Sequence, residues 1–217
     1  MGPIVIINPN STTAVTDKMD AAVESLRIPH GPVLECVTLE EGPAGIETDD
    51  QVAGVVTPIC NLIRTRQEDV SAFVIGCYSD PGLQEARELS AKPVFGIAES
   101  AMLTAMTKGS RFGVISILEQ SIPRHAYQIR KLGFESRCAG DRAIGLRVTE
   151  LADSVRAFNG IRDAAELLRD EDGADVLILG CSGMADNRHR LEEIVGLPVV
   201  EPTQAAAAFA LGTALLS

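Results

Sequence analysis

The 217-residue chain contains no tryptophan, and aromatic residues make up only 4% of it. Basic residues are also few: 19 Lys and Arg stand against 30 Asp and Glu, which gives a formal net charge of -11. Surfaces that bind nucleic acid or anionic membranes need basic patches, so this charge argues against both kinds of partner. The apolar share of 46% still allows a sizeable core, which Val, Ile, Leu and Ala must fill.

Several sorting and cofactor signals are missing as well. There is no basic and apolar leader at Met1 and no apolar run long enough to span a bilayer, so we expect a cytoplasmic protein that binds a small molecule. Neither a GxGxxG fingerprint nor a Walker-type loop occurs, which argues against a nucleotide cofactor. We therefore expect no cofactor, and we expect a homo-oligomer because such assemblies are common among soluble enzymes.

The cysteine count argues against a disulfide framework and against a metal. Five cysteines cannot all pair, and in a cytoplasmic protein they are expected to be reduced. No CxxC pair occurs, and His30, His125 and His189 show no ligand spacing, whereas a structural zinc needs four convergent ligands. The cysteines must therefore serve packing or chemistry.

Strand-like apolar runs alternate with segments of helical periodicity along the whole chain. The predicted strands are Ile4 to Asn8, Val33 to Leu39, Val70 to Gly76, Val94 to Gly96, Arg111 to Ser116, Phe134 to Cys138, Val176 to Gly180 and Val199 to Glu201. The predicted helices are Thr12 to Leu26, Thr48 to Arg66, Leu83 to Leu89, Ser100 to Thr107, Gln120 to Lys131, Thr149 to Arg169, Leu191 to Val195 and Ala205 to Leu216. This alternation predicts an α/β fold with parallel sheets covered on both faces.

The order of these elements repeats in the second half of the chain, which indicates an internal duplication. We predict two similar Rossmann-like lobes, residues 1–108 and 109–217, related by a pseudo-twofold axis with the active site in the cleft between them. The boundary near Lys108 has no flexible linker, and the C-terminal helix at 205–217 is a candidate to pack back on the first lobe.

The most informative repeat is a thiol at the end of a strand in each half. Cys77 and Cys181 each follow a buried-strand pattern and a glycine, and each begins a turn of small residues. Free cysteine is often simply a core residue, and we interpret Cys36, Cys60 and Cys138 in that way because they lack the turn. Ligands bind outside the carboxyl ends of parallel strands, so the matched pair predicts a functional edge.

Other candidate contacts follow the same strand ends. Backbone N–H groups of the two cysteine turns would point between the thiols, and amides at a helix start favour an anion and lower a nearby thiol pKa. The candidate substrate-binding residues are Asn10, Tyr78, Ser79, Ser182, Gly183, Ser100 and Thr203. Asn10 is equally suited to capping the next helix. Asp80 and Asp186 are interpreted as helix-start carboxylates, and His189 as a solvated side chain.

Two acid/base groups on opposite walls of a cleft suit one task in particular. Inverting a carbon centre requires a proton to leave one face and another to arrive on the opposite face, so it calls for one thiolate and one thiol. The two titrations would be coupled. Negative charge that develops on a neighbouring carbonyl oxygen would need the turn amides as fixed donors.

At these positions the chain resembles the aspartate/glutamate/hydantoin racemase superfamily, and most of all its hydantoin and allantoin racemase branch. The resemblance lies in the opening Ile7 to Ser11, the turn Gly76 to Gly82, the strand Arg111 to Val114 and the turn Gly180 to Met184, and it extends over nearly the whole chain. It implies a cofactor-independent two-base racemase in which Cys77 and Cys181 are catalytic and Asn10 and the turn amides hold the substrate.

The substrate stays open at this point. Ser79, Ser182 and the segment Glu201 to Thr203 depart from the pattern of hydantoin racemases. Racemisation of a 5-substituted hydantoin or allantoin is favoured over that of aspartate or glutamate, because Lys and Arg are scarce near the motifs. A related isomerase of the superfamily and a non-catalytic two-lobed sensor are the remaining alternatives.

Overall fold

The computed structural model describes residues 1–216. The strands are β1 (Ile4–Asn8), β2 (Leu34–Thr38), β3 (Ala72–Ile75), β4 (Val94–Gly96), β5 (Phe112–Ser116), β6 (Cys138–Ala143), β7 (Val176–Leu179) and β8 (Val199–Val200). The α-helices are α1 (Thr13–Ala22), α2 (Asp49–Gly54), α3 (Val56–Arg66), α4 (Leu83–Leu89), α5 (Ile97–Ala105), α6 (Ile122–Lys131), α7 (Ser154–Asp170), α8 (Arg188–Val195) and α9 (Pro202–Leu215). Short 3-10 helices cover Glu24–Leu26, Glu119–Ser121, Glu135–Arg137, Val148–Ala152 and Ser182–Asn187.

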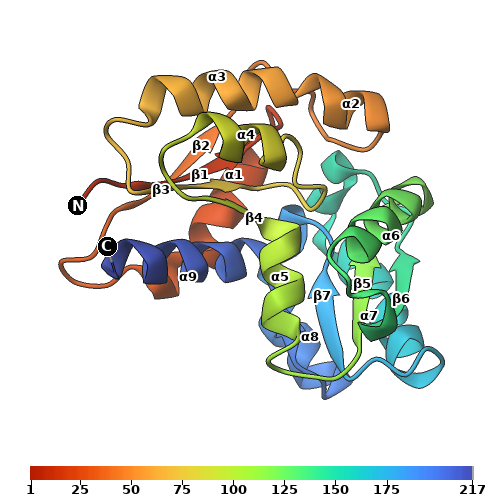
Figure 1. The fold of residues 1–217 in the computed structure, drawn as a ribbon. Coiled ribbons are helices and arrows are strands. Elements are labelled where there is room, and N and C mark those ends of the chain that lie inside the picture. The colour runs from red at the N-terminus through yellow and green to blue at the C-terminus, as the bar shows by residue number, and fades with distance from the viewer. Residues whose placement is uncertain (217) are drawn as a thin grey trace.

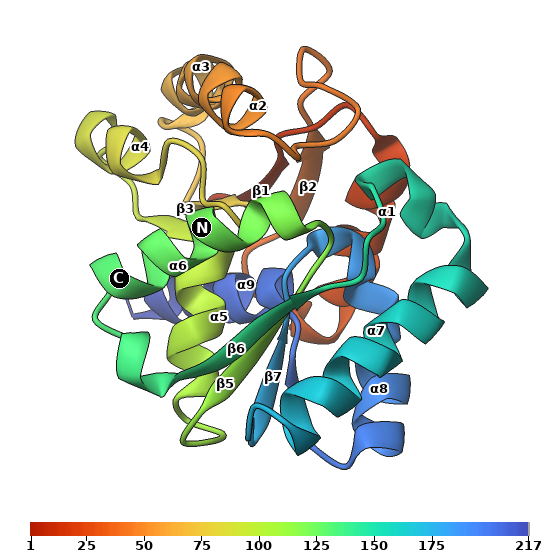
Figure 2. The same ribbon diagram turned by 90° about the vertical axis from the view of Figure 1, so that its right-hand side faces the viewer.

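The strands form two parallel four-stranded sheets with the same internal order. The first sheet runs β2-β1-β3-β4 and the second runs β6-β5-β7-β8, so each strand of the first half has a counterpart in the second. The predicted α/β class with two similar parallel-sheet lobes is confirmed. Figures 1 and 2 show the two sheets in separate lobes, with helices on both faces.

Buried apolar runs explain the central strands. All five residues of β1 and all four of β3 and of β7 are buried. Strands covered on both faces require apolar side chains on both, so β-branched runs such as Ile4–Asn8 are selected rather than an alternating pattern. The structure thereby places the carboxyl ends of β1 and β3, and of β5 and β7, side by side.

One predicted strand is wrong. The segment 134–138 was expected to be a strand, but it forms a 3-10 turn at Glu135–Arg137, and β6 begins only at Cys138. The sequence of β6, Cys-Ala-Gly-Asp-Arg-Ala, is polar and only partly buried because β6 is the edge strand next to β5. Pairing with β5, not local propensity, makes this segment a strand.

Two long predicted helices are divided. The helix expected at 48–66 is split at Val55 into α2 and α3, and Thr48 caps α2 with a side chain that accepts from the backbone N–H of Gln51. The helix expected at 149–169 begins as a 3-10 turn, and α7 starts after Asp153, which accepts from the N–H of Arg156. Both starts use residues that favour the N-cap position.

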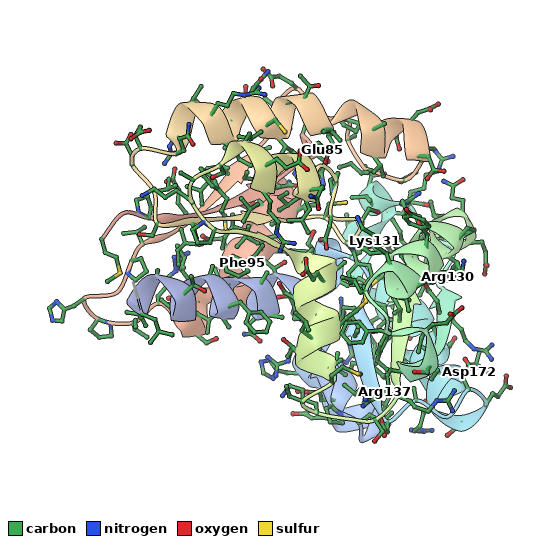
Figure 3. All side chains as sticks on the ribbon, viewed as in Figure 1. Glu85, Phe95, Arg130, Lys131, Arg137 and Asp172 are labelled. Carbon is green, nitrogen blue, oxygen red and sulfur yellow. The ribbon has the colours of Figure 1, made fainter. Side chains whose placement is uncertain are left out.

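The lobes exchange one helix each. Helix α9 contacts β1, β3 and β4 of the first sheet, while α5 contacts β7 and β8 of the second, and the two helices pack on one another (Figure 1). Phe95 of β4 packs beside α9 (Figure 3). Because each half of the chain supplies a helix to the other half's sheet, the lobes share a continuous core. No helix within residues 1–216 combines the length and the apolar character needed to cross a membrane.

Candidate active site

Cys77 and Cys181 directly follow Gly76 and Gly180, which are the first residues after β3 and β7. The N–H of Gly76 donates to the carbonyl of Ile7 at 2.8 Å, and the N–H of Gly180 donates to the carbonyl of Ile115 at the same distance. Both thiols therefore leave equivalent strand ends, one in each lobe.

The two glycines are required by a close approach of backbone. A Cβ added at Gly76 would lie 2.7 Å from the carbonyl oxygen of Ile7 and 2.1 Å from the Met19 side chain. A Cβ at Gly180 would lie 2.7 Å from the carbonyl oxygen of Ile115. Only glycine allows the strand end to stay this close to its neighbour, which fixes where each thiol begins.

Both thiols line one cavity between the lobes. Its volume is about 30 Å³, and its lining residues are Asn10, Ile46, Gly76, Cys77, Tyr78, Ser79, Ile117, Ser121, Arg124, His125, Val148, Gly180, Cys181 and Ser182. Larger surface pockets occur elsewhere, for example one of about 540 Å³ beside Arg142, but that pocket contains no thiol. We place the candidate site at the small cavity because the matched groups converge there.

Burial controls the pKa values of the two thiols. It raises the pKa of Cys77 to about 11, against the backbone N–H of Ser79, which acts to lower it. It raises the pKa of Cys181 to about 12, where the N–H of Gly183 lowers the value and the neighbouring Cys77 raises it. The turn amides act in the expected direction, but the expectation of a lowered thiol pKa is wrong because the loss of solvation outweighs them.

These values predict that the thiols ionise only in alkaline solution. Each thiol pKa lies above the ordinary value of 9.0, so the folded protein keeps these protons to higher pH than a free cysteine does. The measurement is the ultraviolet absorbance of thiolate against pH, taken as the difference between the wild type and the Cys77→Ser/Cys181→Ser double variant. We expect the difference signal to develop above pH 9, in two coupled steps. A difference signal complete below that pH would contradict the burial argument.

Asn10 faces the same cavity from the turn after β1. Its Oδ1 accepts from the N–H of Thr12 at 2.9 Å and from Asn8 Nδ2 at 3.2 Å, which holds the start of α1. Asn10 also lines the cavity. The hydrogen bond to Thr12 supports the role at the start of α1, while a ligand contact by Asn10 stays a prediction.

The other predicted contacts divide into two groups. Tyr78, Ser79 and Ser182 line the cavity, and Gly183 adjoins the second thiol through its N–H. Ser100 and Thr203 do not line this cavity: Ser100 is buried within α5, and Thr203 is fully buried at the start of α9. The Glu201 carboxylate accepts from the N–H groups of Thr203 and Gln204, so this segment caps α9.

Asp80 has a structural role at the start of α5. Its backbone has a positive φ of 43°, and its carboxylate accepts from the N–H groups of Ala98 and Glu99, each at 2.9 Å, and from Gln128 Nε2 at 2.8 Å. Burial raises its pKa to about 7. The prediction of a helix-start carboxylate is confirmed, but the helix is α5, not the adjacent α4.

Replacing Asp80 by alanine is expected to lower the free energy of unfolding by about 1–3 kcal/mol, because the buried N–H of Ala98 and the partly buried N–H of Glu99 lose their acceptor. Urea denaturation measures the change. The matched control is Asp186→Ala, since Asp186 is half exposed and pairs with Lys18 at 3.2 Å. A surface pair contributes under about 1 kcal/mol, so equal effects of the two substitutions would contradict the capping role.

Three residues of the cavity wall were not predicted from the sequence. They are Ser121, directly before α6, and Arg124 and His125 in its first turn. Arg124 Nε donates to Ser79 Oγ at 2.9 Å, and its Nη1 pairs with Asp49 at 2.5 Å. Basic residues looked scarce near the cysteine motifs because α6 is distant from both in sequence. No local motif marks these positions, and only the tertiary fold brings them to the thiols.

The side chain of His125 is hydrogen-bonded to the carboxylate of Asp141. Its Nδ1 lies 2.8 Å from Asp141 Oδ2, Ser116 Oγ donates to Asp141 Oδ1, and the Tyr78 ring meets the imidazole edge-on with centroids 5.0 Å apart. Within residues 1–216, no three His, Cys, Asp or Glu side chains are grouped so as to hold a metal ion.

Comparison with known proteins agrees with this geometry. The sequence matches the Asp/Glu/Hydantoin racemase family over residues 4–210. It is 35% identical to a hydantoin racemase of Rhizobium meliloti over 206 residues, which cover 94% of this chain and 85% of that protein. An allantoin racemase from Klebsiella pneumoniae superposes with a TM-score of 0.94 at 31% identity, over 100% of this chain and 89% of that one. An allantoin racemase from Pseudomonas fluorescens has a TM-score of 0.92 at 29% identity, covering 99% and 91% of the two chains.

The family match over most of the chain, the identity to a hydantoin racemase and the superposition on allantoin racemases point to one family. The chain belongs to the Asp/Glu/Hydantoin racemase family.

Proposed function

We propose that this protein racemises 5-substituted hydantoins, allantoin included, with Cys77 and Cys181 as a pair of acid/base groups. The observation that carries the proposal is the convergence of two thiols, from equivalent strand ends of different lobes, on one cavity. Names of similar proteins support the substrate class, since the relatives cited above are hydantoin and allantoin racemases. Family membership favours an enzyme over the sensor alternative.

The reaction needs one thiolate and one thiol. The thiolate takes the proton from C5 of the ring, the electron pair moves onto the adjacent carbonyl oxygen, and the second thiol returns a proton to C5 on the opposite face. With the other enantiomer as substrate, the two cysteines exchange these roles. We assign the developing oxyanion to the Asn10 side-chain amide and to the backbone N–H groups of Ser79 and Gly183, which also interact with the two thiols.

Binding requires the lobes to separate. With a volume of only about 30 Å³, the cavity is too narrow to hold a hydantoin ring as it stands. Opening would let water reach the thiols and reduce the burial penalty on the thiolate, and closing around the ring would then exclude water from the carbanion.

An acidic amino acid fits less well. Aspartate or glutamate brings two carboxylates, each of which needs a cationic or multiple N–H partner. Among the residues that line the cavity, Arg124 supplies one guanidinium, and its Nη1 pairs with Asp49, so its remaining N–H groups could serve one polar group of a substrate but not two carboxylates. An uncharged ring, whose α-proton is acidified by flanking carbonyl and nitrogen, makes no such demand.

The test is to incubate the wild-type protein with single enantiomers of allantoin, 5-isobutylhydantoin, aspartate and glutamate and to follow optical rotation, after subtracting the uncatalysed rate. We expect rotation to decay with the ring substrates and to persist with the free amino acids. Decay with aspartate or glutamate alone would overturn the substrate class but not the racemase chemistry.

We extend the proposal to the cellular location, the partners and the oligomeric state of the enzyme. With a net charge of -11, it is expected to act on a small molecule in the cytoplasm, without a nucleic-acid or membrane partner, and to form a homo-oligomer. Light scattering after size exclusion would give the molar mass; a mass of one 217-residue chain would contradict the oligomer.

A further inference from the structure

The cavity has a polar wall that the two-thiol chemistry does not use. It is formed by Ser121, Arg124 and His125, at the start of α6 in the second lobe. Ser121 is 3% exposed and lies directly before α6. His125 is also only 3% exposed, and its hydrogen bonds to Ser116 and Asp141 are made through Nδ1. Both residues line the cavity, so a bound molecule could reach their polar groups there.

The hydrogen bonds behind His125 fix its tautomer. Asp141 on β6 accepts from Ser116 Oγ through one oxygen and from His125 Nδ1, at 2.8 Å, through the other. A carboxylate can only accept, so Nδ1 carries the hydrogen of this pair, and Nε2 is the ring nitrogen left for a ligand in the cavity. The Tyr78 ring, at 82° to the imidazole plane, restricts its rotation.

Stability alone does not explain this arrangement. The Asp141 and His125 side chains are 7% and 3% exposed, and an apolar pair of similar volume at such positions is commonly as stable or more stable. A buried carboxylate that holds an imidazole at the wall of a cavity is a common arrangement at functional sites.

We propose that His125, positioned by Asp141, binds the 5-substituent of the substrate, and that the enzyme therefore prefers hydantoins whose substituent carries hydrogen-bond donors, such as the ureido group of allantoin. This inference rests on the proposed racemase function and narrows its substrate class. Nε2 accepts from a ureido N–H, and Arg124 and Ser121 lie on the same wall to meet the ureido carbonyl.

A hydrocarbon substituent would leave these groups without partners. It would remove water from Nε2 and the Ser121 hydroxyl and return no hydrogen bond, which is the situation in which sites discriminate most strongly against an analogue. The apolar side chains of Ile46, Ile117 and Val148 line the same cavity and are suited to cover a flat ring.

The test compares two substrates of the same shape. The 5-substituents of allantoin and of 5-isobutylhydantoin have the same number and branching of heavy atoms, so they differ in polarity and not in size. For the wild type we expect kcat/KM for allantoin to exceed that for 5-isobutylhydantoin by about tenfold or more.

Two variants test whether His125 and Asp141 cause the preference for allantoin. His125→Leu is expected to lower the allantoin to isobutylhydantoin ratio of kcat/KM by about tenfold, because the acceptor is lost while isobutylhydantoin still turns over. Asp141→Asn is expected to lower the same ratio, because an amide facing Nδ1 permits the other tautomer. The matched control is His189→Leu: His189 is 83% exposed, lies outside the cavity and should leave the ratio unchanged.

The outcomes separate this inference from the racemase function. A wild type that racemises both substrates with a ratio at or below one, or a ratio unaffected in both folded variants, would overturn the role of His125 and leave the racemase intact. If His125→Leu fails to fold by circular dichroism, the ratio in Asp141→Asn decides. A wild type that racemises neither substrate would overturn the proposed function and this inference together.

Discussion

Replacing either Cys77 or Cys181 by serine is expected to lower the rate of racemisation about a thousandfold or more. An acid/base side chain contributes roughly 10²–10⁴-fold, and inversion needs both groups in the same turnover, so loss of one removes the proton route on one face. A serine hydroxyl keeps the size and most hydrogen bonds of the thiol but is a much weaker acid. The measurement is kcat/KM from the decay of optical rotation of a ring substrate.

The matched control is Cys36→Ser. Cys36 is a partly buried cysteine on β2 that does not line the cavity, so the variant should retain activity within a fewfold of the wild type. If Cys77→Ser and Cys181→Ser kept activity comparable to that of Cys36→Ser, the thiols would be packing residues and the two-base mechanism would be wrong.

Replacing Gly180 by alanine is expected to lower kcat/KM about a hundredfold, because displacement of a catalytic group by about 1 Å has an effect of that size. The added Cβ would lie 2.7 Å from the Ile115 carbonyl oxygen and 3.1 Å from Val114 Cγ1, so the end of β7 must move away from β5 and carry Cys181 with it. The overpacking should also lower the free energy of unfolding by about 1–3 kcal/mol. Activity assays and urea denaturation measure the two effects.

Gly212→Ala provides the comparison. Gly212 lies within α9, and a Cβ there would meet no atom within 4 Å. Alanine in a helix interior is favoured over glycine by up to about 1 kcal/mol, so this variant should be fully active and slightly more stable. Similar losses in the two variants would mean that the close approach at Gly180 does not set the position of the thiol.

The central strands of both sheets, and the position of each thiol after a strand end, could be predicted from the sequence. Runs such as Ile4–Asn8 are apolar on both faces, so their place in a parallel sheet is readable locally, and the glycine before each cysteine marks a strand end where backbones meet. The edge strand β6 could not be read in this way, because its polar residues adopt a strand only through pairing with β5.

The polar wall of the cavity was also beyond local patterns. His125 had no ligand spacing and Arg124 lay far from either cysteine motif, so neither carried a signal in the sequence. Their meaning depends on Asp141, which β6 places behind His125, and on Ser79, which accepts a hydrogen bond from Arg124. Conversely, Ser100 and Thr203 occupied matching places in the two halves, but the start of each following helix buries them away from the cavity.

The central claim is that the two thiols act on opposite faces of one carbon. Its most direct test is hydrogen exchange at C5 in deuterated water, followed by NMR, with Cys77→Ser and Cys181→Ser and each enantiomer of the ring substrate. Each variant retains one thiol, so we expect it to exchange the C5 hydrogen of one enantiomer without inversion, and the two variants to act on opposite enantiomers. Exchange of the same enantiomer by both variants, or of both enantiomers by either one, would contradict a base on each face.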